Sequence, residues 1–390
     1  MMNPIYLDYA ATTPVDPRVA AKMGAALTLE GNFANPASKS HRYGWEAAEA
    51  VDIARSQVAA LCGADSREIV FTSGATESDN LAIIGVAEAL AKSSPRRHII
   101  TSMLEHKAIL DPCHYLESKG YKVTYLQPGS DGIITKEMLA DAIDEDTLLV
   151  SLMHANNEIG VIQDIGELAK VAHEAGALFH SDCAQSAGKV KIDVTTMPVD
   201  YLSFSAHKVY GPKGIGAFYV RQGVPLPEPV IRGGGHERGM RSGTLATHQI
   251  VGMGEAYALA VKEFKRDTSR LQEMRDKLAA SLLALPGTKV NGSISARLPN
   301  NLNVTFSGVN GETFLLALRG LAVSTGSACT SASLNPSYVL KALGLSDSDA
   351  HSSIRISFGR FTTDEEIEAA IKIFTEVYAE QKKLGSGWSA

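Results

Sequence analysis

Short apolar runs alternate with helical patterns along the middle of the chain. Apolar runs of this length are typical of buried strands, and apolar residues at three- and four-residue steps are typical of helices. The alternation predicts a mainly parallel, doubly wound sheet. The predicted strands are 69–72, 98–101, 123–126, 148–153, 178–181, 201–204 and 217–220, and the predicted helices between them include 77–90, 108–119, 136–143 and 165–174.

The residues before position 69 do not show this alternation of strands and helices. Residues 1 to about 40 are rich in turn formers and are expected to be mostly irregular. Residues 45–61 are predicted to form a helix, because Val51, Ala54 and Val58 recur at helical spacing and Gly63 stops it.

A second, smaller domain is predicted towards the C-terminus. A glycine-rich loop at 232–244 leads into a helical region at 248–285, which Pro286-Gly287 ends. We expect a large α/β domain at 15–260, and a small α/β domain formed by 1–14 and 261–390 with a mobile cysteine loop at about 324–336. The elements predicted after the helical region are strand 302–306, helix 311–318, strand 354–357 and a helix from residue 363.

Composition narrows the class of protein. The chain has 390 residues, of which 45% are apolar and 21% charged, as in ordinary globular proteins. The net charge of −6 gives no electrostatic support for binding nucleic acid or an anionic membrane. No apolar run approaches the ~20 residues that span a bilayer. The N-terminus has no basic start followed by an apolar stretch, so we expect no secretory signal and a cytoplasmic protein.

The four cysteines, Cys62, Cys113, Cys183 and Cys329, lie far apart in the sequence. Their spacing predicts neither a structural zinc site nor a disulfide scaffold. Cys183 is expected to be a small buried residue, because strand alternation points it away from its neighbour Asp182. Cys329 lies among small polar residues and is expected to be exposed and mobile. It could act as a nucleophile if a base or cation lowered its pKa, or it could be an inert thiol.

Three segments rich in reactive groups fall at the carboxyl ends of predicted strands, which is where open parallel sheets bind ligands. They are 72–77, 181–185 and 205–208. The last contains Lys208, between small residues and a Gly-Pro turn. A lysine at a strand end can form a Schiff base with a carbonyl if its surroundings lower its pKa, whereas most lysines are simply solvated.

The other two segments suit an anion and a protonated ring. Gly74 lets the chain turn into a helix whose free N–H groups, with the Thr76 hydroxyl, could bind phosphate; helix capping alone is the alternative. Asp182 could pair with a protonated ring nitrogen, or it could be a helix cap. Gln185 could donate to a ring oxygen.

Two further residues are candidates for binding and proton transfer. His106, after strand 98–101, could stack on a flat cofactor and move protons, or be an ordinary hydrogen-bonded histidine. Arg355 alternates with apolar residues on a predicted strand. It could grip a carboxylate with both arms of its guanidinium, or face solvent.

A lysine, a ring-pairing carboxylate, a stacking histidine and a phosphate turn are the parts that a pyridoxal phosphate site needs. The sequence resembles the cysteine desulfurases of the iron–sulfur-cluster assembly type (IscS/NifS-like), in the class-V aminotransferase family. The resemblance runs from Tyr6 to about Arg360, and its motifs are residues 6–14, 71–80, 101–107, 154–160, 205–208 and 327–331. It implies a fold-type I pyridoxal-phosphate enzyme.

The resemblance also implies a role for each motif residue. Lys208 would hold the cofactor through a Schiff base, His106 would stack and move protons, and Asp182 would pair with the ring nitrogen. Cys329 would attack the sulfur of the bound cysteine, giving alanine and a persulfide. The remaining implied contacts are Gln185 and Asn157 to the ring and substrate side, Ala75, Thr76, Ser205 and His207 to the phosphate, Thr244 to the phosphate from a second subunit, and Arg355 with Asn35 and Asn157 to the substrate carboxylate.

The implied partners are L-cysteine, a second copy of the chain, an iron–sulfur scaffold protein and sulfur-carrier proteins, with tRNA thiolation as a further destination of sulfur. Cys329 is in addition a candidate for a transient cluster ligand shared with the scaffold; no other metal is expected. Many members carry a longer C-terminal extension that meets the scaffold. The alternatives are a selenocysteine lyase or aminotransferase on the same fold, and a non-catalytic relative that binds sulfur-handling partners.

Overall fold

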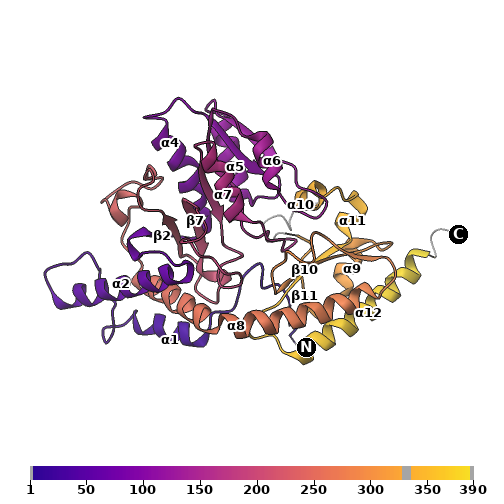
Figure 1. Cartoon of the computed structure of the whole chain (residues 1–390). Coiled ribbons are helices and arrows are strands. Elements are labelled where there is room, and N and C mark those ends of the chain that lie inside the picture. The colour runs from indigo at the N-terminus through magenta and orange to yellow at the C-terminus, as the bar shows by residue number, and fades with distance from the viewer. Residues whose placement is uncertain (1–2, 327–334, 387–390) are drawn as a thin grey trace.

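The computed structural model describes residues 3–326 and 335–386 (Figure 1). Seven strands form one sheet, at the positions that the sequence predicted. Neighbouring strands from β7 to β4 run parallel, whereas β8 runs antiparallel to both of its neighbours. The order is β2 (Ile69–Thr72), β8 (Gly216–Val220), β7 (Tyr201–Ser205), β6 (Leu178–Asp182), β5 (Thr147–Ser151), β3 (His98–Ser102) and β4 (Lys122–Leu126).

The reversed direction of β8 follows from its short connection to β7. A parallel crossover needs a dozen or more residues, usually with a helix. The connection between these strands contains only η3, a 3₁₀ turn (Ala206–Lys208). The chain therefore returns antiparallel, which places the turn with Lys208 at the edge of the sheet where β7 ends.

Helices cover both faces of this sheet, and the strands alternate between two cores. Ile99 and Leu149 belong to one apolar cluster, and their neighbours Ile100 and Val150 to the other. The helices of this part are α3 (Ala75–Asn80), a π-helical turn η2 (Leu81–Gly85), α4 (Val86–Leu90), α5 (Lys107–Glu117), α6 (Lys136–Ala142) and α7 (Ile165–Glu174). The predicted helix 77–90 is thus one helical stretch that begins two residues earlier and contains a π turn.

Three further helices pack together beside the sheet. They are α1 (Pro17–Ala25), α2 (Arg42–Cys62) and the long α8 (Thr247–Leu283). The expectation that residues 1–40 are mostly irregular is confirmed for the described residues 3–40, but α1 was not predicted. This helix buries Val19 alone, so its apolar pattern is weak, but Asp16 accepts the backbone N–H of Arg18 and Pro17 occupies the first turn. These are start signals of a helix.

A second, antiparallel sheet has β10 (Asn301–Phe306) between β12 (Ser353–Ser357) and β9 (Thr288–Val290). The N-terminal strand β1 (Ile5–Tyr6) pairs with β11 (Leu321–Ala322). An apolar cluster that includes Leu7, Leu278, Phe306 and Phe374 forms the core of this part. Its helices are α9 (Gly311–Ala317), α10 (Tyr338–Ala342), α11 (Asp347–His351) and α12 (Asp364–Ser386). The sequence did not predict α10, α11, β1, β9 or β11.

Helix α8 runs beneath both sheets, from α2 at one end to α12 at the other (Figure 1). Two short 3₁₀ turns, η1 (Ser66–Glu68) and η4 (Glu237–Gly239), complete the described elements. Among the described residues, no helix combines the length and apolar character needed to cross a membrane.

Candidate active site

A cavity of about 390 Å³ lies at the carboxyl ends of the parallel strands. Gly74, Asp182 and Ser205, from the ends of β2, β6 and β7, contribute to its lining. The structure therefore brings together the three segments 72–77, 181–185 and 205–208 at one edge of the sheet. This is the edge at which open parallel sheets bind ligands.

Lys208 lies at the wall of this cavity, at the end of the 3₁₀ turn that follows β7. Its Nζ donates hydrogen bonds to the carbonyl oxygens of Ala10 at 2.6 Å and Ala11 at 2.8 Å. Both alanines also line the cavity. Because the N-terminal segment crosses the end of β7 here, the amine of Lys208 is directed at the site, and the alternative of a solvated surface lysine does not fit.

Asp182 and His106 line the same cavity and also cap local structure. Oδ1 of Asp182 accepts the N–H of Ala184 at 2.8 Å, and Nδ1 of His106 accepts the N–H of Ala108 at 3.1 Å. Since Nδ1 is an acceptor, a neutral His106 carries its proton on Nε2. Burial lowers the pKa of His106 and raises the pKa of Asp182, and the charges of the two groups oppose both shifts. Capping and cavity lining thus coexist in both residues.

Small and polar groups gather at one end of the cavity, among them Ala75, Thr76, Ser205 and His207. The Nδ1 of His207 lies 3.1 Å from the Thr12 hydroxyl. Burial, and then the charge of Lys208, lowers the pKa of His207 to about 4, so the ring is neutral at neutral pH and can donate one hydrogen bond. This end of the cavity can bind an anion through neutral donors.

Glu77 fixes the turn at this end. Its Oε2 accepts the N–H of Ser73 at 2.7 Å, and its Oε1 accepts from Nε of Arg241 at 3.0 Å. Arg241 belongs to the glycine-rich segment 232–244, so this ion pair holds that segment against the cavity edge.

Arg355 and Asn157 line the same cavity. The side chain of Arg355 is 1% exposed, which excludes the solvent-facing alternative. Its Nη1 donates to the carbonyl oxygen of Asn157 at 3.0 Å, and its Nη2 to Oδ1 of Asp8 at 2.8 Å. Nε of Arg355 and Oδ1 of Asn157 are buried without a hydrogen-bond partner among the described residues. Both residues line the cavity, so these unpaired polar atoms lie beside a space that is suited to a polar ligand.

Two of the predicted site residues that the structure describes are not among those that line the cavity. Asn35 is exposed, and its Oδ1 accepts the N–H of Ala37 in a local turn. Thr244, predicted to act from a second subunit, is exposed on its own chain. Cys329 and most of the predicted loop 324–336 lie outside the described residues. The remaining predicted residues, including Gln185, all line the cavity.

Two buried carboxyl groups beside Asp182 were missed in the sequence. Asp79 lines the cavity floor, and its Oδ1 lies 3.7 Å from Nε2 of His180. Oε1 of Glu105 accepts the N–H of Met153 at 2.9 Å. Burial, reinforced by the charge of Asp182, raises the pKa of both groups well above the ordinary range. The charge of one carboxylate opposes ionisation of its neighbours. Asp182 is the least buried of the three, and the charges of His106 and Lys208 favour its ionised form.

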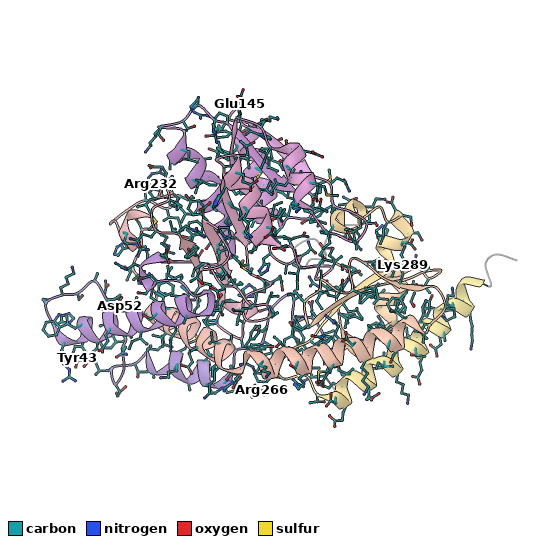
Figure 2. All side chains as sticks on the ribbon, in the orientation of Figure 1. Tyr43, Asp52, Glu145, Arg232, Arg266 and Lys289 are labelled. Atoms are coloured by element: carbon teal, nitrogen blue, oxygen red, sulfur yellow. The ribbon has the colours of Figure 1, made fainter. Side chains whose placement is uncertain are left out.

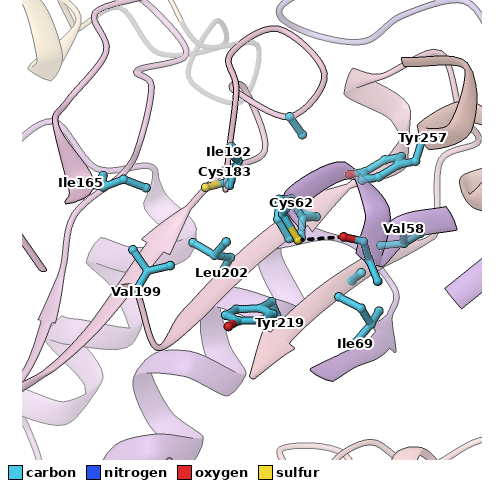
Figure 3. Packing of buried hydrophobic residues seen from close by; sticks show 14 of the residues in the cluster. Val58, Cys62, Ile69, Ile165, Cys183, Ile192, Val199, Leu202, Tyr219 and Tyr257 are labelled. Carbon is cyan, nitrogen blue, oxygen red and sulfur yellow. Dashed lines mark hydrogen bonds between the residues drawn. The ribbon is translucent and has the colours of Figure 1, made fainter. Parts of the chain in front are cut away.

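The cysteine at position 183 is fully buried, as predicted from strand alternation. Figure 3 shows Cys183 and Cys62 packed among the apolar side chains of the main core. Burial raises the pKa of the Cys183 thiol far above its ordinary range. Such a thiol is inert, so the Asp-Cys sequence at the end of β6 places no second nucleophile in the site.

The cavity fits pyridoxal phosphate in its chemistry. It offers an amine for the carbonyl carbon, a carboxylate for the ring nitrogen, neutral donors for a phosphate and an arginine with a buried unpaired donor for an amino-acid carboxylate. These groups come from separate parts of the chain and face one space.

Comparison with known proteins agrees with this geometry. The sequence model described as "Aminotransferase class-V" matches residues 5–370. The chain belongs to the class-V aminotransferase family. Enzymes of this family depend on pyridoxal phosphate, so the predicted cofactor and the predicted fold-type I architecture are confirmed.

Named relatives indicate which kind of class-V aminotransferase the chain resembles. The chain is 58% identical to "Cysteine desulfurase IscS" of Pseudomonas aeruginosa (strain LESB58), over 100% of this chain and 96% of the relative. A solved structure described as "NIFS-LIKE PROTEIN" is 38% identical and superimposes with a TM-score of 0.89, covering 96% of this chain and 99% of that one. Another, "SspA in complex with cysteine", is 39% identical with a TM-score of 0.80, covering 92% and 100%.

These likenesses confirm the resemblance to cysteine desulfurases on which the sequence interpretation rests. They favour cysteine desulfurase activity over the selenocysteine lyase and aminotransferase alternatives. The chain is therefore an enzyme of the cysteine desulfurase type.

Proposed function

We propose that this chain removes sulfur from L-cysteine in the Lys208 cavity, giving L-alanine and a persulfide on Cys329. One observation carries the proposal. Lys208, Asp182, His106 and Arg355 come from four different segments, and all line a single cavity of about 390 Å³. The similar SspA structure is a complex with cysteine, which supports the same substrate here.

The residues of the cavity suggest how the cofactor is held. Pyridoxal phosphate, when bound, withdraws electrons from an amino acid attached to it. Lys208 would bind its carbonyl carbon, Asp182 would pair with the ring nitrogen, and Gln185 would contact the ring hydroxyl. His106 holds a proton at Nε2, where it can be passed to or from the substrate. The phosphate would meet Ala75, Thr76, Ser205 and His207, with Thr244 of a second subunit.

Arg355 would bind the substrate carboxylate, with Asn157 and Asn35 as further contacts. The guanidinium is buried at the cavity wall, where little water competes with a ligand. It has five N–H donors, and the described residues accept only two hydrogen bonds from it. Donors therefore remain for a carboxylate in the cavity.

Sulfur transfer needs a thiol close to the substrate. In the proposed step, Sγ of Cys329 bonds to the substrate sulfur while the Cβ–S bond breaks. The Cβ keeps the electron pair of the broken bond and gains a proton to become the methyl group of alanine. The proton that the Cys329 thiol loses accounts for the proton that the Cβ gains. The segment towards Cys329 begins against the substrate-binding strand, because Ser324 and Arg355 exchange backbone hydrogen bonds at 2.6 and 3.3 Å.

The test is to add L-cysteine to the holoenzyme, measure alanine and locate any added sulfur by mass spectrometry. We expect alanine and one extra sulfur atom on Cys329. A Cys329→Ala variant should form no persulfide, whereas Cys183→Ala, which changes only a buried thiol, should behave like the wild type. Persulfide on another cysteine, or undiminished sulfide release by Cys329→Ala, would refute the assignment.

We propose further that the enzyme is a homodimer. Exposed apolar side chains gather around α1 and α2, among them Leu27, Leu29, Phe33, Trp45 and Ile53. Figure 2 places Tyr43 and Asp52 on α2 at the margin of the molecule, far from the second sheet. Such a patch suits an interface between copies. Light scattering should give twice the mass of the chain. In a mixed dimer of Thr244→Ala and Lys208→Ala chains, only one of the two sites has both Lys208 and the Thr244 of the other chain. Mixing the two variants should therefore restore cofactor binding in only some of the sites.

The remaining predictions concern partners, place and domains. We propose an iron–sulfur scaffold and sulfur carriers as the acceptors of sulfur, in the cytoplasm, with tRNA thiolation as a further destination.

We propose a large domain at 15–260 and a small one at 1–14 with 261–390. Supporting this division, the seven-stranded sheet lies wholly in the first range and the antiparallel sheet in the second. The boundary would fall inside α8, so the two domains would share one helix.

A further inference from the structure

Asp8 forms an ion pair with the arginine that faces the cavity. Oδ1 of Asp8 accepts from Nη2 of Arg355 at 2.8 Å, and Asp8 is the acid paired with that guanidinium among the described residues. A buried arginine without a counter-ion would be costly. The two residues are 347 positions apart, so the contact exists only in the folded chain.

The backbone around Asp8 is fastened to the strand that carries Arg355. The N–H of Ser357 donates to the carbonyl of Leu7 at 2.8 Å, and the N–H of Tyr9 donates to the carbonyl of Ser357 at 3.2 Å. Asp8 is therefore held beside Ser357, which lies two residues after Arg355 in β12. Asp8 is not among the residues that line the cavity, whereas Arg355 is. The carboxylate thus contacts the guanidinium from outside the cavity.

Two of the three nitrogen atoms of the guanidinium are held in this way. Nη2 is bonded to Asp8 and Nη1 to the carbonyl of Asn157, while Nε is buried without a partner among the described residues. A planar guanidinium held at two corners cannot rotate, so its remaining donors keep one direction. Two-pronged recognition of a carboxylate depends on that direction.

We propose that Asp8 is a positioning residue for the substrate: it holds the guanidinium of Arg355 so that the free N–H donors meet the α-carboxylate of the amino acid. This inference rests on the proposed function and adds to it a residue that does not touch the substrate. Asp8 acts through Arg355, and its removal affects binding of the carboxylate more than the later chemistry.

The experiment compares Asp8→Ala, which removes the acceptor, with Asp8→Asn, which keeps an oxygen at Oδ1 but loses the charge. Charge-assisted hydrogen bonds of this kind correspond to roughly a tenfold or greater change in binding. We expect Asp8→Ala to raise KM for L-cysteine by about tenfold or more with kcat changed much less, and Asp8→Asn to lie between it and the wild type. Cofactor content, from absorbance of the holoenzyme, should stay unchanged.

Asp16→Asn is the matched control. Asp16 lies in the same N-terminal segment and pairs with Arg360 at 2.8 Å, but neither of these residues lines the cavity. Its KM should equal that of the wild type. If Asp8→Ala does not fold, the test is the KM of Asp8→Asn compared with that of the wild type, for which we expect a smaller rise.

Three results would overturn the inference. An unchanged KM in both Asp8 variants would show that Arg355 needs no positioning, and a lowered KM would show that Asp8 competes with the substrate instead. A fall in kcat with KM unchanged would place Asp8 in a later step. In each case the wild type would still make alanine. A wild type that makes none would refute the proposed function, and this inference with it.

Discussion

The amine of Lys208 lies 2.6 Å from the carbonyl oxygen of Ala10, although 198 positions separate the two residues. The same carbonyl accepts from Nε2 of Gln185 at 2.9 Å. The N-terminal segment therefore ties two cavity residues to one backbone atom. This arrangement directs the lysine into the cavity and stabilises its position there.

Replacing Lys208 should abolish covalent attachment of the cofactor. In Lys208→Ala no amine remains at the end of β7 to form a Schiff base with the cofactor carbonyl. Borohydride reduction followed by mass spectrometry should find cofactor mass on the wild type and none on the variant. Lys213→Ala is the control, because Lys213 is another lysine lining the cavity and its loss should leave the attached mass unchanged. Cofactor mass on Lys208→Ala would contradict the assignment.

Three of the four cysteines should resist alkylation in the native protein. Cys62, Cys113 and Cys183 are fully buried, and burial raises the pKa of Cys62 and of Cys113 to about 12. A thiol with that pKa has almost no reactive thiolate at neutral pH. Iodoacetamide and peptide mapping should label none of the three before unfolding and all three after it. Rapid native labelling of any of them would show that the core around it opens.

Neutralising Glu105 should stabilise the fold increasingly as pH rises. Burial raises the pKa of Glu105 well above its usual 4.5. From about pH 4.5 upwards the unfolded chain releases this proton while the folded chain keeps it, so folding stability falls with rising pH. Glu105→Gln does not titrate, and its amide oxygen can still accept the N–H of Met153.

Urea unfolding of Glu105→Gln and wild type at about pH 5 and pH 8 checks this. The midpoint of the variant should exceed that of the wild type by more at the higher pH. The same difference at both values would mean that the Glu105 carboxyl is already ionised in the folded protein.

A side chain at Gly216 should disturb the phosphate end of the cavity. An added Cβ would lie 2.5 Å from the carbonyl oxygen of Phe204 and 2.6 Å from Cα of Gly74, both rigid backbone atoms. The backbone of β7, of β8 or of the turn at Gly74 must then move, at a cost of roughly 1–3 kcal/mol. Gly216→Ala should lower the melting temperature and weaken retention of the cofactor on dialysis.

Gly24→Ala is the control for that substitution. Its added Cβ would meet no atom within 4 Å, and it lies in helix α1, where alanine is the better helix former. It should leave cofactor retention unchanged and the melting temperature equal or higher. If Gly216→Ala behaved in the same way, β7 and the turn at Gly74 would be more adaptable than their close approach to Gly216 implies.

Much of the fold could be predicted from the sequence because its signals are local. The seven strands of the large sheet are apolar runs between helices, and each lies within two residues of its predicted position. The direction of β8 also has a local cause, a connection too short for a helix, although the sequence prediction did not include it. Helix α1 was missed because only Val19 is buried, which leaves its apolar pattern weak.

The sequence by itself determined which reactive groups this protein has and where they stand on strands: Lys208 after β7, Asp182 at the end of β6 and Arg355 within β12. Such motifs are written in consecutive residues. Only the tertiary structure decided that Asp79 and Glu105 are buried beside Asp182 and that Asp8 meets Arg355. The physical reason is that burial and charge pairing depend on distance in space. No local pattern distinguishes an acid that will be solvated from one that will hold an arginine in place.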